Sequence, residues 1–132
     1  MNKRIKEAVL KKYNGHCAYC GIELTIGRMH IDHIHPKSGW KEVDDNNELL
    51  DINRIDNLNP SCRECNSYKH FYSINEFRGL LDQLLWTNPE YLFKSVTKMK
   101  IAERFGAIRR VEWDGLFYFE KFKKEGGENV ES

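Results

Sequence analysis

The four cysteines of this chain fall into two pairs, Cys17-Ala-Tyr-Cys20 and Cys62-Arg-Glu-Cys65. A two-residue spacer lets both thiolates of a pair reach one metal ion, and two such pairs complete the tetrahedron that Zn²⁺ prefers. A redox-active C-x-x-C pair or unrelated buried thiols would be the alternatives, but two pairs in a reducing compartment favour a metal. We therefore predict a structural zinc bound by four cysteines.

The spacing between the pairs is long, because 41 residues (21–61) separate them. A simple zinc ribbon has only about 15–20 residues there, so this metal must close a loop that contains structure of its own. With 132 residues and 40% hydrophobic residues, the chain can build one modest core that gains from a metal staple. Its net charge of +1 means that any surface for a polyanion must be a local patch.

Hydrophobic periodicity predicts a helix over residues 3–13 that ends at Asn14-Gly15. We expect its remaining surface to be basic, because it carries Lys3, Arg4, Lys6, Lys11 and Lys12. A strand is expected over residues 28–35, because Pro36 would end it. The polar, acidic residues that follow, up to Asp56, predict a solvated loop with a helical turn around 48–52. A further helix is expected from Cys65 through His70.

Residues 73–76 match a capping box and predict a helix with a leucine-rich apolar face. Asn88-Pro89 marks the start of another helix, expected to end at Gly106. Asp114-Gly115, between the apolar segments Ile108–Trp113 and Leu116–Phe122, predicts a terminal hairpin.

These patterns divide the chain into a core over residues 1–70, a helical extension over 71–124 that packs on the core, and a flexible tail over 125–132. No apolar run approaches the ~20 residues of a membrane span, and the charged N-terminal helix lacks the pattern of a signal peptide. We therefore expect a cytoplasmic protein without a membrane partner.

The residues best suited to chemistry lie in the predicted strand, His30-Ile31-Asp32-His33-Ile34-His35. Strand alternation places His30 and Asp32 on one face, and His33 and His35 on the other. A metal held by Asp32 and a water activated by His33 would therefore need a bent strand end or a substrate between them.

Three elements occur in order: C-x-x-C, Ile-Asp-His-Ile-x-Pro, and Asn-Leu-x-x-x-Cys-x-x-Cys-Asn-x-x-Lys. Over residues 17–69 this pattern resembles the HNH endonucleases that carry a four-cysteine zinc. The resemblance implies an α+β fold: a small ββα-metal core stapled by zinc, with an N-terminal helix and a C-terminal helical extension. It also implies an enzyme that hydrolyses DNA phosphodiester bonds and leaves a 5′-phosphate. Gly39-Trp40 stands where the family has a Gly-Gly pair, and the stretch to Asn57 is longer and more acidic.

The resemblance assigns roles residue by residue. His33 would be the general base that takes a proton from the attacking water, because an imidazole exchanges protons near neutral pH. Asp32 and Asn66 would hold a catalytic Mg²⁺ or Mn²⁺, since both ions prefer oxygen ligands. Asn57 would brace the loop and orient His33. Because Asn66 replaces the last histidine of the motif, the chain would be an H-N-N variant.

Several cations are candidate DNA contacts, each with a structural alternative. Lys69 matches the lysine of the motif and could pair with a phosphate. His30 could contact a phosphate or simply line the strand, and His70 could face the site or the solvent. Lys37 and Arg63 are further candidate contacts with the DNA backbone.

Two other functions stay open. A non-catalytic zinc-knuckle protein could hold nucleic acid without cutting it, and an assembly protein could reuse the zinc scaffold. The joint presence of Asp32, His33, Asn57 and Asn66 argues for catalysis, because a binding module does not need all four. A homodimer and a phage or restriction partner protein are both compatible with the sequence.

Overall fold

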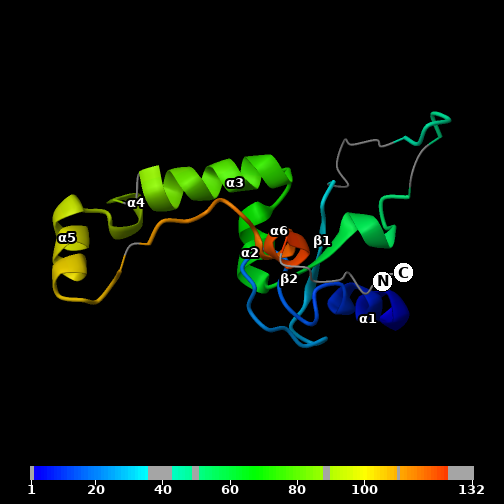
Figure 1. Ribbon diagram of the computed structural model, residues 1–132, viewed down its shortest axis with the longest axis horizontal. Helices are drawn as coiled ribbons and strands as arrows, with labels where there is room; N and C mark the ends of the chain where they lie inside the picture. Colours follow the sequence, from blue (N-terminus) through cyan, green and yellow to red (C-terminus); the bar gives the residue numbers. More distant parts are fainter. Residues whose placement is uncertain (1, 36–42, 49–50, 88–89, 110, 125–132) are drawn as a thin grey trace. The chain divides into compact units, whose positions relative to one another are not determined.

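A computed structural model describes residues 2–35, 43–48, 51–87, 90–109 and 111–124 (Figure 1). It contains two compact units, one formed by Met1–Ser73 with Leu116–Ser132 and the other by Ile74–Gly115. The predicted extension over 71–124 is thereby divided, because residues from 116 onward join the first unit. Its packing on the core stays a prediction, and the predicted tail over 125–132 lies outside the described residues.

The first unit opens with helix α1 (Lys3–Lys11). Asn2 caps it by accepting a hydrogen bond from the Ile5 amide at 2.9 Å. The helix confirms the sequence prediction, although Lys12 is its C-cap and not part of an exposed basic face. Lys12 is only 2% exposed and donates to the carbonyl oxygens of Ile55 at 3.0 Å and Leu58 at 2.7 Å. The expectation that Lys12 lies on the basic surface was therefore wrong.

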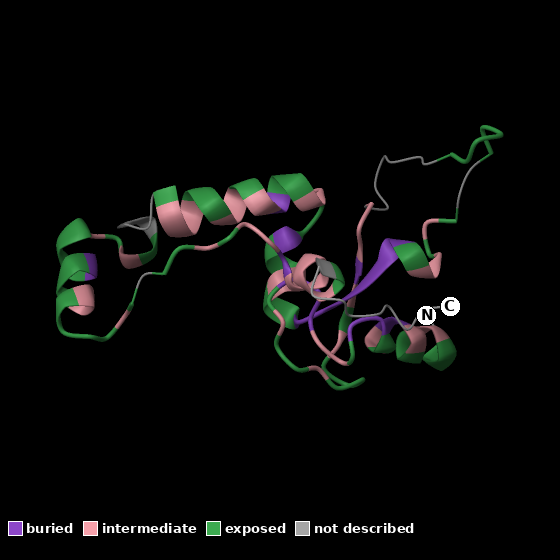
Figure 2. Cartoon of the chain, in the orientation of Figure 1, coloured by how far each residue is buried: buried purple, intermediate pink, exposed green. Residues whose placement is uncertain are grey.

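Two antiparallel strands, β1 (His30–His33) and β2 (Leu58–Ser61), form the sheet. In their register Asp32 faces Asn59, and His33 faces Leu58. All four residues of β2 are buried, and Figure 2 shows the buried positions gathered along this strand. A short 3-10 helix, η1 (Ile55–Asn57), leads into β2. The helical turn predicted around 48–52 falls partly outside the described residues.

Helix α2 (Arg63–Lys69) follows β2 directly. Cys62 is its N-cap, and the Cys62 sulfur accepts a hydrogen bond from the Cys65 amide at 3.4 Å. The helix therefore begins inside the second cysteine pair, two residues earlier than predicted. It ends at His70, whose φ of 51° leaves the helical region. The two strands and α2 confirm the small ββα arrangement expected for the core.

The predicted terminal hairpin was wrong, because residues 118–124 form helix α6 (Tyr118–Lys124). The Glu120 carboxylate accepts a hydrogen bond from the Phe117 amide at 2.9 Å, which stabilises the first turn of the helix. The Phe119 amide donates to the Ala18 carbonyl at 2.7 Å, and the Phe117 ring meets the Tyr19 ring edge-on at 5.3 Å. Capping and aromatic packing therefore outweigh the Asp-Gly turn signal.

The second unit contains α3 (Ile74–Asp82), a π-helical turn (Gln83–Thr87), α4 (Glu90–Phe93) and α5 (Val96–Arg104). The single helix predicted up to Gly106 is in fact broken. Lys94 has a φ of 55°, and Ser95 caps α5 by accepting from the Lys98 amide at 3.3 Å. The predicted start at Asn88-Pro89 lies outside the described residues. None of the helices in the described segments combines the length and the apolar composition needed to cross a membrane.

Candidate metal centre and active site

The four cysteines come together as the spacing predicts. Their sulfur atoms all lie within 4.8 Å of one another, and the sulfurs of Cys20 and Cys62 are 3.8 Å apart. A tetrahedral zinc with Zn–S bonds of about 2.3 Å requires S–S edges of about 3.8 Å, so the cluster has the right size. The donor set and its dimensions are those of a structural zinc site.

The first cysteine pair is shaped by a tight turn in which the Gly21 amide donates to the Cys17 carbonyl at 3.0 Å. Gly21 has a φ of +82°, which side-chain-bearing residues rarely adopt. A Cβ atom there would also lie 2.8 Å from the Tyr118 ring. Both the backbone conformation and the close approach of the Tyr118 ring therefore favour glycine at position 21. Because Tyr118 belongs to α6, this turn also packs the first cysteine pair against that helix.

The thiols are electrostatically coupled because their sulfurs are so close. Hydrogen bonds from Cys20 and Cys65 lower the pKa of Cys17 far below its usual value. The hydrogen bond with Cys17 in turn raises the pKa of Cys20 to about 11, and that of Cys65 is raised further. One thiolate thus forms at the expense of its neighbours, and a divalent cation is what allows all four to ionise.

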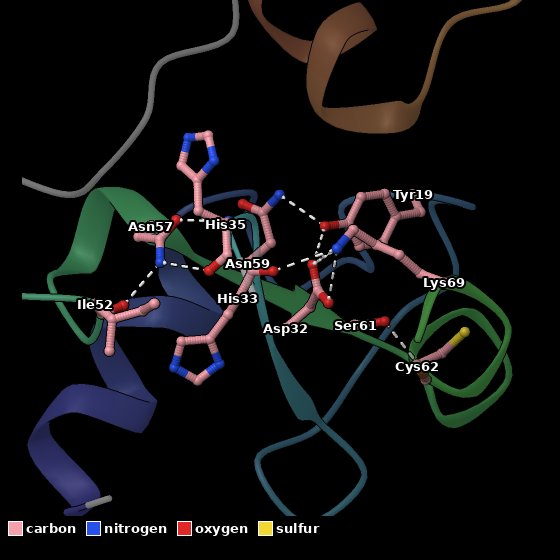
Figure 3. A network of polar contacts seen from close by, with 10 residues as sticks. All are labelled: Tyr19, Asp32, His33, His35, Ile52, Asn57, Asn59, Ser61, Cys62 and Lys69. Carbon is pink, nitrogen blue, oxygen red and sulfur yellow. Dashed lines mark hydrogen bonds and ion pairs between the residues drawn. The ribbon is translucent and has the colours of Figure 1, made fainter. Parts of the chain in front are cut away.

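A second polar cluster lies between the sheet and α2 (Figure 3). Asp32 is 4% exposed, and its carboxylate accepts from the Lys69 ammonium at 3.1 and 3.2 Å and from the Tyr19 hydroxyl. The Lys69 ammonium also donates to the His33 carbonyl at 3.3 Å and is fully buried. Lys69, expected to contact a DNA phosphate, instead has its charge paired with Asp32.

Burial sets the protonation of this cluster. It raises the pKa of Asp32 above the usual carboxyl value, while Lys69 and then Tyr19 act in the opposite direction. The pKa of Tyr19 is also raised, by burial first and by the Asp32 charge second. Tyr19 therefore keeps its proton and donates it, and the charge on Asp32 depends on Lys69.

Asn59 belongs to the same cluster, although our sequence analysis did not select it. It is fully buried, faces Asp32 across the sheet, and donates its amide to the Tyr19 oxygen at 3.3 Å. Its Oδ1 has no hydrogen-bond partner in the part of the chain that the structure describes. Buried acceptors are rarely left in this way, because losing water without replacement costs free energy. A polar residue inside an otherwise buried strand was the signal that could have identified it.

His33 points away from the Asp32 carboxylate, as strand alternation requires (Figure 3). Its Nε2 lies 2.8 Å from the Asn53 side-chain oxygen. An amide oxygen only accepts, so this contact places the proton of the neutral ring on Nε2 and leaves Nδ1 as the basic nitrogen. Asn53 is a second residue that sequence reasoning missed, because it lies in a loop without a pattern.

Asn57 is 1% exposed and clamps two segments of backbone. Its oxygen accepts from the His35 amide at 2.8 Å, and its nitrogen donates to the carbonyls of His35 at 3.2 Å and Ile52 at 2.8 Å. These bonds fix the chain that leaves β1 against the loop that contains Asn53. Asn57 thus joins the backbone next to His33 and the backbone next to Asn53.

The remaining candidates lie around these clusters. Asn66 is half-buried on α2, one turn before Lys69 and on the same side of the helix. His30 and Arg63 are exposed and, with Arg28, line a depression of about 310 Å³ whose rim also carries Glu23 and Glu64. His70 is exposed at the C-cap of α2, and Lys37 lies outside the described residues.

Comparison with known proteins gives one family and one structure. Residues 17–71 match the family model described as HNH endonuclease. A crystal structure of the Type II-C Cas9 enzyme from Actinomyces naeslundii aligns at 24% identity and a TM-score of 0.45. The alignment covers 57% of this chain and 7% of that one. No curated protein matches the chain.

Proposed function

We propose that this protein, whose residues 17–71 belong to the HNH endonuclease family, is a metal-dependent endonuclease that hydrolyses DNA phosphodiester bonds. The observation that carries the proposal is His33, a half-buried histidine whose ring is held by Asn53 at 2.8 Å and whose backbone segment is clamped by Asn57. A ring held in one orientation with one basic nitrogen is what proton abstraction requires.

In the proposed reaction, Nδ1 of His33 takes a proton from a water molecule as that water attacks phosphorus. The 3′ oxygen leaves, and the product carries a 5′-phosphate. Asn53 stabilises the imidazolium that forms, because its oxygen already accepts from Nε2. Asn57 keeps His33 and Asn53 at a fixed separation, so it is a positioning residue.

The donors around Asp32 fit a hard divalent cation. The carboxylate of Asp32, the half-buried amide of Asn66 and the unpartnered oxygen of Asn59 are all oxygen ligands, which Mg²⁺ and Mn²⁺ prefer. We propose Asp32 and Asn66 as the protein ligands of this metal. When bound, Mg²⁺ or Mn²⁺ supplies positive charge that stabilises the phosphate in the transition state.

The zinc in this proposal is structural. Four thiolates fill a tetrahedron and leave no open position for a water or a substrate. Cys62 is both a zinc ligand and the N-cap of α2, so the metal fixes the start of the helix that carries Asn66 and Lys69. Loss of zinc should therefore disorder the catalytic residues, although the zinc itself takes no direct part in the chemistry.

The proposed DNA contacts are local, in keeping with a net charge of +1. His30, Arg63 and Arg28 share one depression next to the cysteine pair, and we propose them as individual phosphate contacts, because Glu23 and Glu64 in the same lining balance the two arginines. Lys37 is proposed from the sequence alone.

Conversion of supercoiled plasmid to nicked or linear DNA tests the function. Zinc-loaded protein is incubated with Mg²⁺ or Mn²⁺, and the control omits the divalent ion instead of adding a chelator, so that the zinc stays bound.

The variant His33→Ala should abolish cleavage. His16→Ala is the matched control, because His16 contacts the Tyr13 carbonyl and the Tyr118 ring and has no place in the proposed reaction. Retained cleavage in His33→Ala would refute the assignment of His33 as the general base. Folded protein that binds DNA without cleaving it would favour the non-catalytic alternative.

A further inference from the structure

The Lys69 ammonium lies in an environment that resembles the coordination shell of a metal ion. It contacts three oxygens: both carboxylate oxygens of Asp32, at 3.1 and 3.2 Å, and the His33 carbonyl at 3.3 Å. The side chain is fully buried, which lysine tolerates only when its charge is paired. The oxygen cluster proposed to hold the catalytic metal thus already holds a cation that belongs to the chain.

The cluster is nevertheless incomplete around this cation. Asn59 faces Asp32 across the sheet and is linked to it through Tyr19, yet its buried Oδ1 has no hydrogen-bond partner among the described residues. An ammonium can donate only three hydrogen bonds, and those of Lys69 are directed at Asp32 and His33. A divalent ion has six or more coordination positions, which protein oxygens and bound waters fill. These positions are enough for every oxygen of the cluster to contact the ion or one of its waters.

We propose that Lys69 is a resident counter-ion that holds the place of the catalytic metal, so that the Lys69 ammonium and Mg²⁺ or Mn²⁺ exclude one another at Asp32. This inference rests on the proposed metal-dependent function. An ammonium and a divalent ion at contact distance from one buried carboxylate repel each other strongly, because their repulsion is poorly screened there. Metal binding must therefore break the Lys69 contacts, and this cost lowers the affinity for the metal.

The local structure allows such an exchange without unfolding. Lys69 is the last residue of α2, and the chain leaves the helix at His70. Its long, flexible side chain can change rotamer while the helix and the zinc site stay in place. Tyr19, by contrast, holds Asp32 from the side of the first cysteine pair and would keep the carboxylate oriented during the exchange.

The test measures the affinity of the zinc-loaded full chain for Mn²⁺. Electron paramagnetic resonance monitors the binding at about pH 8, where carboxyl groups ionise. Lys69→Met keeps the length of the side chain and removes its charge, and it should tighten Mn²⁺ binding by about tenfold or more. Lys69→Arg keeps the charge and should not tighten it. Lys12→Met is the matched control, because Lys12 is also buried and donates to the carbonyls of Ile55 and Leu58. Equal Mn²⁺ affinity in Lys69→Met and wild type would overturn the proposal.

A second measurement uses the wild-type chain, in case Lys69→Met does not fold. Acetic anhydride labelling followed by peptide mass spectrometry reports which lysine ammonium groups are accessible. Lys69 should be protected without Mg²⁺ and become reactive at saturating Mg²⁺, while Lys12 stays protected in both states. Lys69 that remains protected at saturating Mg²⁺ would overturn the proposal.

Plasmid cleavage measured in parallel separates this inference from the proposed function. Mn²⁺ binding that Lys69→Met strengthens, without cleavage by any variant, supports the exchange and contradicts the nuclease function. Cleavage by the wild type, with Mn²⁺ affinity that does not respond to Lys69→Met, supports the nuclease and refutes the exchange.

Discussion

The four-cysteine cluster and the Asp32 cluster are two groups of ionisable side chains in the same unit. The negative charge that forms in each cluster is neutralised in a different way. The thiols lie against one another, and the hydrogen bond with Cys17 raises the pKa of Cys20 to about 11. Asp32 has a resident cation, because Lys69 contacts both of its oxygens. The geometry of the first cluster therefore fits an external metal, whereas the carboxylate of the second is already paired with a cation of the chain. A structural site and an exchangeable site differ here in whether the chain supplies its own counter-ion.

The largest expected effect is loss of the zinc ligand set. Cys62→Ser should lower both bound zinc and stability, because in small zinc domains metal binding supplies about 10–16 kcal/mol of folding free energy. Thermal unfolding followed by circular dichroism, with zinc measured on the same samples, checks this. Withdrawal of Mg²⁺ alone should leave the unfolding curve unchanged. Full zinc content and unaltered stability in Cys62→Ser would contradict the difference drawn between the two clusters.

The next largest effect concerns the buried ion pair. Lys69→Met leaves the Asp32 carboxylate buried without its cation and should cost about 3–5 kcal/mol of unfolding free energy. Adding Asp32→Asn in the double variant should recover most of this loss, because no charge then remains in the cluster. Urea denaturation of both variants measures the two values. If the double variant is no more stable than Lys69→Met, the pair does not act as a unit.

The pH dependence of the same variant follows from the pKa of Asp32. Burial raises that pKa, and Lys69 is the first influence that lowers it, so Lys69→Met should raise it further. A carboxyl group whose pKa is raised by folding stabilises the protein below its unfolded pKa, and this stabilisation is lost as the pH rises through the folded value. The cost of Lys69→Met should therefore be small near pH 4 and grow toward neutral pH. Urea denaturation at a series of pH values measures it, and a cost independent of pH would show that Asp32 does not titrate in this range.

The zinc cluster could be predicted from the spacing within each cysteine pair, whereas the ββα core was expected only from the family resemblance. C-x-x-C pairs determine their own geometry, and α1 and α3 follow apolar periodicity. Strand β2 was not assigned, because Asn57, Asn59 and Pro60 hide the usual strand alternation. Helix α6 was mistaken for half of a hairpin, since the contacts between Phe117 and Tyr19 join residues distant in sequence.

The candidate site residues were selected from the sequence, and their catalytic roles stay predictions, whereas their pairings come from the structure. Asp32, His33 and Asn57 could be selected from the motif, whereas their partners Tyr19, Asn53 and Asn59 carry no signature. Lys69 was selected because it matches the lysine of the motif and could pair with a DNA phosphate, and its contacts with Asp32 were not foreseen. Which charges pair inside a fold depends on tertiary contacts such as that between α2 and β1, and periodicity does not encode them.

The smallest expected effect comes from Lys12, a second buried lysine, whose ammonium donates to backbone carbonyls where that of Lys69 contacts a carboxylate. Lys12 donates to the carbonyls of Ile55 and Leu58, which flank Asn57, and lies near the Tyr13 ring at 5.8 Å. Lys12→Met should cost about 1–3 kcal/mol, the range for leaving buried acceptors unsatisfied, because the carbonyls of Ile55 and Leu58 then lose this donor. Urea denaturation beside Lys69→Met gives the comparison. A loss as large as that of Lys69→Met would mean that burial of the ammonium, and not its pairing with Asp32, governs both sites.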